Sequence, residues 1–67
     1  MSAKQQFLIE HNNLAPDHLQ VTATVLTRFR QEKPAVFKNC DWDIEKIRRP
    51  FIMWLTSFKP GEIKAMG

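Results

Sequence analysis

The sequence contains a single cysteine, Cys40, and only two histidines, His11 and His18. No disulfide bond can form within such a chain, and a closed zinc site needs about four Cys or His ligands. We therefore expect no bound metal and no cofactor. An unpaired cysteine in a chain without a recognisable secretion signal is typical of a reducing compartment, so we expect a cytoplasmic protein.

Glycine is equally scarce, because Gly61 and Gly67 are the only two in the chain. A phosphate-binding loop needs several glycines within a short stretch, so nucleotide hydrolysis is not expected. Histidine is the usual acid–base residue near neutral pH. No serine or acid is spaced beside His11 or His18 in a way that indicates a catalytic triad. The sequence thus predicts no catalytic residues, no enzymatic activity and no small-molecule substrate.

Long apolar runs are missing as well. The longest apolar stretch, Phe51 to Leu55, is far shorter than the roughly 20 residues that a membrane-spanning helix needs. We therefore expect no membrane partner.

The residues that are present predict one small domain, residues 1–67. Apolar residues make up 43% of the chain and include five Phe and two Trp, a composition that is not typical of disorder. A domain of this length buries only about 60% of the surface of its unfolded chain. Its core rarely supplies more than roughly 3–5 kcal/mol. We therefore expect docking on a partner, or on a second copy of the chain, to contribute to stability.

The first half of the chain predicts two helices. The segment Ser2–Gln5 has the form of a capping box, which predicts a short helix over residues 3–12. Pro16 predicts the start of a second helix, and Lys33 its end, because the residue before a proline is pushed out of the helical region. The segment Val21–Val25 alternates in the manner of a strand, but the apolar spacing that follows it favours a helix.

The second half contains the clearest helical pattern, which runs from Asp41 to Phe58. Acidic residues stand in its first turn, and apolar residues recur at intervals of three and four. Pro50 lies inside this pattern and predicts a kink, or a helix restart near Arg48. Residues 60–67 have too few apolar side chains to require an ordered structure. The expected fold is all-α, a small bundle of two long helices plus a short N-terminal helix, with the last helix kinked at Pro50.

Aromatic, methionine and arginine residues gather on this last helix. Trp54, Met53 and Phe51, rimmed by Arg48 and Arg49, predict a protein-binding surface, because Trp and Arg are common interface anchors and Met adapts to a partner. The competing interpretation is that the apolar members of this group pack in the core. We expect a non-enzymatic regulatory or adaptor module whose partner is a protein or its own second copy. Phages and plasmids encode many small regulators of this size, so we expect an origin in such a mobile element, by association alone.

A nucleic-acid surface is the alternative. Its candidate phosphate contacts are Arg28, Arg30, Lys33, Arg48 and Arg49. Ten Lys and Arg against seven Asp and Glu leave a net charge of +3, which is modest for a protein that binds DNA or RNA. These residues could instead form a solvated face of mixed charge with weak ion pairs.

Overall fold

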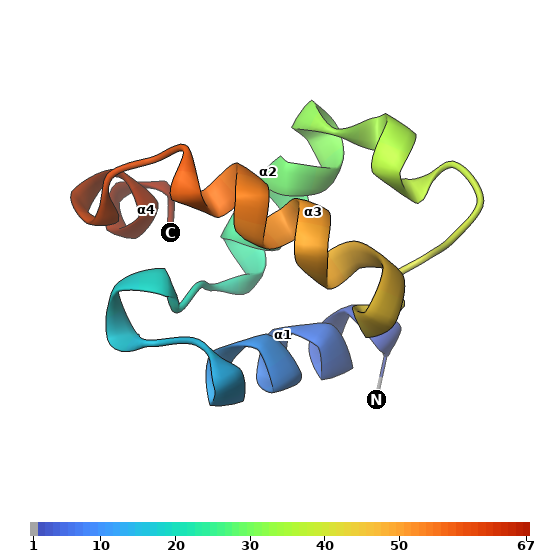
Figure 1. Ribbon diagram of the computed structural model, residues 1–67, viewed down its shortest axis with the longest axis horizontal. Helices are drawn as coiled ribbons and strands as arrows, with labels where there is room; N and C mark the ends of the chain where they lie inside the picture. Colours follow the sequence, from blue (N-terminus) through green and yellow to red (C-terminus); the bar gives the residue numbers. More distant parts are fainter. Residues whose placement is uncertain (1) are drawn as a thin grey trace.

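The computed structural model describes residues 2–67, and regular structure in this range is entirely helical (Figure 1). The elements are α1 (Ala3–Leu14), the 3₁₀ turn η1 (Asp17–Leu19), α2 (Ala23–Glu32), the 3₁₀ turn η2 (Pro34–Phe37), α3 (Ile44–Thr56) and α4 (Pro60–Met66). The all-α prediction is confirmed. The detailed prediction is not matched, because α1, α2 and α3 have 12, 10 and 13 residues and a fourth helix follows them.

Helix α1 begins with the capping box that the sequence predicts. The Ser2 hydroxyl accepts a hydrogen bond from the Gln5 backbone N–H at 3.2 Å, and the Gln5 side chain accepts one from the Ser2 N–H at 3.1 Å. The helix continues to Leu14, two residues beyond the predicted end. It stops at Ala15, whose extended backbone is the conformation expected before a proline.

Helix α2 begins later than the sequence predicts. The turn after Pro16 forms only η1, and the backbone is extended again at Gln20 before α2 starts at Ala23. The cause is a tertiary contact, because both backbone groups of Val21 are hydrogen-bonded to the side chain of Asn12 and so do not join a helix. The possible strand at Val21–Val25 does not form. The predicted end of the helix at Lys33 is confirmed.

Helix α3 is the element that the sequence predicts best. The Asp43 side chain caps its N-terminus by accepting from the Glu45 N–H at 3.0 Å. The helix runs without a break from Ile44 to Thr56, so it does not restart near Arg48. Pro50 lies inside it and has no N–H to donate to the preceding turn.

Helix α4 replaces the unstructured tail that the composition of residues 60–67 suggested. Pro60 stands at the start of the helix, where its fixed φ angle is favourable. Ile63 is only 2% exposed and belongs to the core, and Met66 packs against that core. The helix contacts α2 and η1, so Ile63 and Met66 anchor the C-terminal segment to the rest of the fold.

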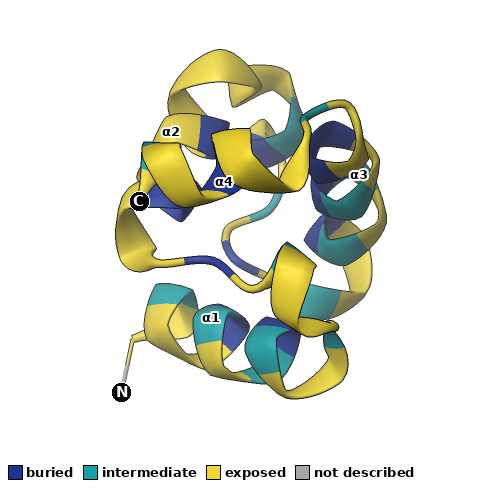
Figure 2. Ribbon diagram, turned by 90° about the vertical axis from the view of Figure 1, so that its left-hand side faces the viewer, coloured by how far each residue is buried: buried dark blue, intermediate teal, exposed yellow. Residues whose placement is uncertain are grey.

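The core is one cluster to which every α-helix contributes, and Figure 2 shows the buried residues on the inward faces of the helices. Its buried apolar members are Phe7, Val21, Val25, Leu26, Phe29, Phe37, Trp42, Ile47, Phe51, Trp54, Leu55 and Ile63. Phe51 is central, with its ring centroid 5.0 Å from that of Phe29 and 5.4 Å from that of Phe7. The aromatic rings of three helices therefore meet around α3, and this packing fixes which face of α3 points outward.

Candidate functional site

Phe51 and Trp54 are core residues, which corrects the docking surface predicted from the sequence. Phe51 is fully buried and Trp54 is 7% exposed. The Trp54 ring lies 5.2 Å from the Phe29 ring and 5.0 Å from the Phe58 ring, so it fills the space between α2 and α3. Trp42 is also 7% exposed, and its ring lies 4.6 Å from that of Phe37. Neither tryptophan can therefore serve as an exposed anchor.

Met53 is the one apolar member of the predicted surface that faces solvent, with 68% of its surface exposed. It lines a groove on the outer side of α3 that also contains the two predicted arginines. We call this feature the α3 groove and define it by its lining residues: Ile44, Glu45, Arg48, Arg49, Ile52 and Met53. These residues form two rows on the helix, and the residues within each row are four positions apart in the sequence. The two rows lie side by side on the helix surface.

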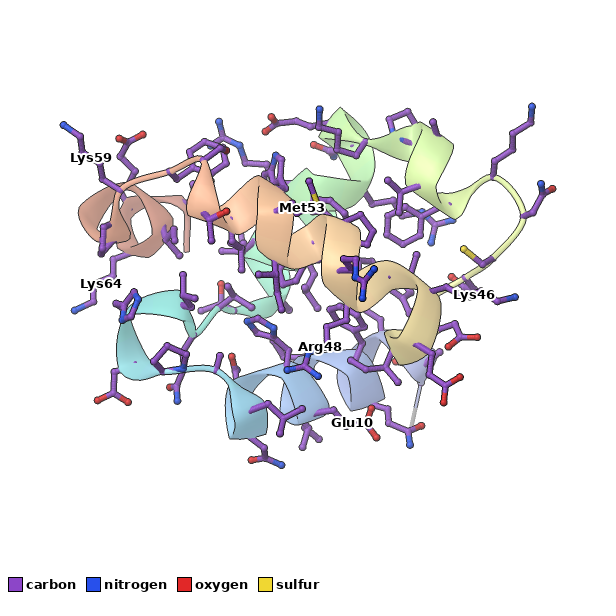
Figure 3. All side chains as sticks on the ribbon, viewed as in Figure 1. Glu10, Lys46, Arg48, Met53, Lys59 and Lys64 are labelled. Atoms are coloured by element: carbon purple, nitrogen blue, oxygen red, sulfur yellow. The ribbon has the colours of Figure 1, made fainter. Side chains whose placement is uncertain are left out.

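Two smaller hollows continue the α3 groove on either side. Toward α1, Arg48 and Ile52 also line a hollow that reaches Leu14, and Figure 3 shows Arg48 between α3 and α1. Toward η2, Met53 also lines a hollow that contains Lys33. The surface therefore extends from the end of α1, where Leu14 is 61% exposed, across α3 to the end of α2.

The predicted phosphate-binding residues do not form one surface. Arg28 pairs with Glu32 at 2.6 Å. Arg30 pairs with Asp41 at 3.2 Å and also lies over the Phe37 ring. These two arginines line separate hollows, away from the α3 groove.

The other three basic residues lie on or beside the α3 groove. Arg48 and Arg49 line it directly, and Lys33 lies in the adjoining hollow that shares Met53. The two ion pairs found among residues 2–67 involve none of these three side chains. Their charge is therefore available to a binding partner, and Glu45 is the one acidic residue that lines the α3 groove.

His11, near the end of α1, is buried. Its Nε2 atom lies 2.9 Å from the Leu19 carbonyl oxygen, and its ring centroid is 5.0 Å from that of Phe51. Burial lowers the pKa of His11 below 6.5, the positive charge of Arg48 lowers it further, and the hydrogen bond to Leu19 opposes both effects. The four-residue spacing from Phe7, on the inward side of α1, is the signal that could have placed His11 in the core.

Other chemical features are sparse within residues 2–67. No group of three His, Cys, Asp or Glu side chains is arranged to hold a metal ion. The Cys40 thiol is half-buried and donates to the Val36 carbonyl oxygen at 3.2 Å. None of the described helices combines the length and the apolar character needed to cross a membrane.

Comparison with known proteins adds no functional information. No family model matches the chain, and no match was found among curated proteins or solved structures. The α3 groove is therefore the candidate site because of its own geometry. An exposed methionine lies beside two arginines that form no ion pair with any described residue, on a helix whose opposite face lies in the core.

Proposed function

We propose that the protein is a non-enzymatic regulatory or adaptor module that binds a protein partner through the α3 groove. The observation that carries the proposal is the exposure of Met53 next to Arg48 and Arg49. A flexible methionine adapts to an apolar surface, and arginine is enriched among residues that dominate binding energy. The lone cysteine makes the cytoplasm its expected location.

The composition of the α3 groove supports binding rather than catalysis. Its lining consists of two isoleucines, one methionine, two arginines and one glutamate. These side chains offer apolar contact and charge, and the set contains no pair of a nucleophile and a base. Helix α3 is also held rigidly on its other side by Ile47, Phe51 and Leu55, each of which is fully buried. A rigid helix presents its outer face to a partner at little cost in conformational entropy.

A protein partner is favoured over nucleic acid because of how the basic residues are distributed. Arg28 and Arg30 are engaged in ion pairs away from the α3 groove, which leaves Arg48, Arg49 and Lys33 as the available charges of the predicted set. Phosphate binding relies on many such contacts. The exposed Met53 would gain nothing from a phosphate backbone, whereas a protein surface can bury it.

The test is selection of peptides from a random display library on the immobilised full-length protein. Peptides that bind the original protein should lose binding to the Met53→Asp variant. They should keep binding to the Ile9→Asp variant, which carries the same type of change at an apolar residue that is 47% exposed on α1. Circular dichroism of each variant verifies that the fold is intact.

Two results would contradict the proposal. One is a set of selected peptides that bind the Met53→Asp variant as tightly as the original protein. The other is tight binding of a duplex DNA or single-stranded RNA probe that weakens by orders of magnitude between about 50 and 200 mM salt. In the second case, loss of binding in Arg28→Ala and Arg49→Ala with no effect of Met53→Asp would assign the protein to the nucleic-acid binders.

A further inference from the structure

The shape of the α3 groove specifies the kind of protein segment that fits it; this inference rests on the proposed function. One wall is the row Ile44, Arg48, Ile52, and the other is the row Glu45, Arg49, Met53. Each row follows the four-residue ridge of a helix, and the valley between two such ridges is the groove into which a second helix packs its own ridge. The packing that results has a crossing angle of about −50°. A helix is therefore the occupant that matches the shape.

The order of chemical groups along the α3 groove specifies the sequence of that helix. Ile44 lies at one end, Arg48 and Arg49 lie in the middle, and Ile52 and Met53 lie at the other end. The distance from Ile44 to Ile52 along the axis is about 12 Å, or a little over two turns. A matching ridge is apolar at both ends and acidic in the middle, where a carboxylate can accept hydrogen bonds from a guanidinium.

A second copy of the chain does not fit this pattern. If two α3 grooves faced each other about a two-fold axis through their centres, the arginine pair of one copy would lie against the arginine pair of the other. Like charges brought together at an interface repel each other and strongly disfavour association. Nucleic acid does not fit either, because its uniform negative charge would leave Ile44 and Met53 without apolar partners and would face Glu45.

We infer that the α3 groove binds an acidic amphipathic helix of a protein partner, with a ridge that reads apolar, acidic, apolar at intervals of four residues. Glu45 beside Ile44 sets the direction in which the partner helix lies along the α3 groove, because a basic residue of the partner is favoured at that end. Lys33 in the adjoining hollow extends the attraction for carboxylates beyond Met53.

The experiment uses a display library of helical peptides in which three ridge positions, four residues apart, are randomised. We expect Asp and Glu to be enriched at the central position by about tenfold over Gln and Asn, the ratio that one charge-assisted hydrogen bond supports. Selection on the Arg49→Glu variant should shift this enrichment to Lys and Arg. Selection on Lys64→Glu, which carries the same type of change on α4, should leave it unchanged (Figure 3).

Each contrary outcome has a distinct meaning. Enrichment of apolar residues at all three positions, independent of Arg49 but lost in Met53→Asp, would overturn the acidic-helix inference and leave the protein-docking function standing. Absence of any peptide that depends on Met53 would overturn both. A concentration-dependent dimer in sedimentation experiments that is lost in Met53→Asp would show that a second copy occupies the α3 groove, and would also overturn the inference.

Discussion

The side chain of Asn12 exchanges two hydrogen bonds with the backbone of Val21. The amide Nδ2 atom donates to the Val21 carbonyl oxygen, and Oδ1 accepts from the Val21 N–H, each at 3.0 Å. Both backbone groups of Val21 are thereby satisfied without a helix or a sheet. This pair closes the connection between α1 and α2 and positions the turn η1.

Replacement of Asn12 by Asp tests this relationship with almost no change of shape. The carboxylate can still accept from the Val21 N–H, but it repels the carbonyl oxygen to which Asn12 donates. We expect the free energy of unfolding to fall by about 1–3 kcal/mol, as for a buried acceptor that loses its partner. Urea unfolding measures the change. Asn13→Asp, at the exposed neighbouring position, is the control and should behave like the original protein; an equal effect of both variants would contradict the prediction.

His11 makes the stability of the fold depend on pH. Its pKa in the folded chain is lowered by burial and by the charge of Arg48, so in the pH range below 6.5 the unfolded chain binds more protons than the folded one. Stability is therefore fully present above pH 6.5. The free energy of unfolding should fall progressively as the pH is lowered through 6.5. The contribution of His11 to this fall should level off below the pKa of His11 in the folded chain. Urea unfolding at a series of pH values measures this dependence.

The His11→Gln variant isolates that contribution. It removes the titrating group, so the decline of stability just below pH 6.5 should become shallower, although the variant is less stable overall because the packing with Phe51 is lost. His18→Gln is the control, because His18 is exposed. A steeper slope in His11→Gln, or a loss of the slope in His18→Gln, would show that His11 is not the group responsible.

Local signals predicted those parts of the fold that depend on neighbouring residues. The capping box of Ser2, the proline after Lys33 and the apolar spacing of α3 all act within a few residues, and each was interpreted correctly. The late start of α2 was not predictable in this way. It depends on Asn12, which lies nine residues before Val21 and reaches it only once η1 has reversed the chain.

The candidate site was predicted only in part, because it too depends on a contact between residues that are distant in the sequence. Met53 and Trp54 are adjacent and point in directions about 100° apart on a helix. The pattern of α3 alone allows either one to lie at the edge of the apolar stripe. The packing of Trp54 against Phe29 on α2 determines that Trp54 is buried and Met53 is exposed. Phe29 lies far from α3 in the sequence, so the pattern of α3 alone does not reveal this contact. Arg48 and Arg49 line the α3 groove together with Met53.

Ile63 should account for most of the stability that α4 provides. It is 2% exposed and is the one buried residue of this helix. Ile63→Ala should lower the free energy of unfolding by about 2–5 kcal/mol, the range for truncation of a large aliphatic side chain in a core. Lys64→Ala changes an exposed neighbour and should stay within about 0.5 kcal/mol of the original protein. Hydrogen exchange of the α4 amides is the direct measurement, and unchanged protection in Ile63→Ala would contradict the assignment.

Trp54 should be essential for folding and dispensable for binding. Trp54→Ala removes contacts with Phe29 and Phe58 and should cost about 3–5 kcal/mol, as much as a core of this size supplies in total. The variant should therefore be unfolded by circular dichroism. Trp54→Phe keeps a ring in the core, so it should fold and still bind peptides selected on the α3 groove. Met53→Ala should show the opposite behaviour, with an unchanged unfolding midpoint and weakened peptide binding, because Met53 is 68% exposed. A folded Trp54→Phe protein that binds no peptide would instead place the tryptophan in the interface.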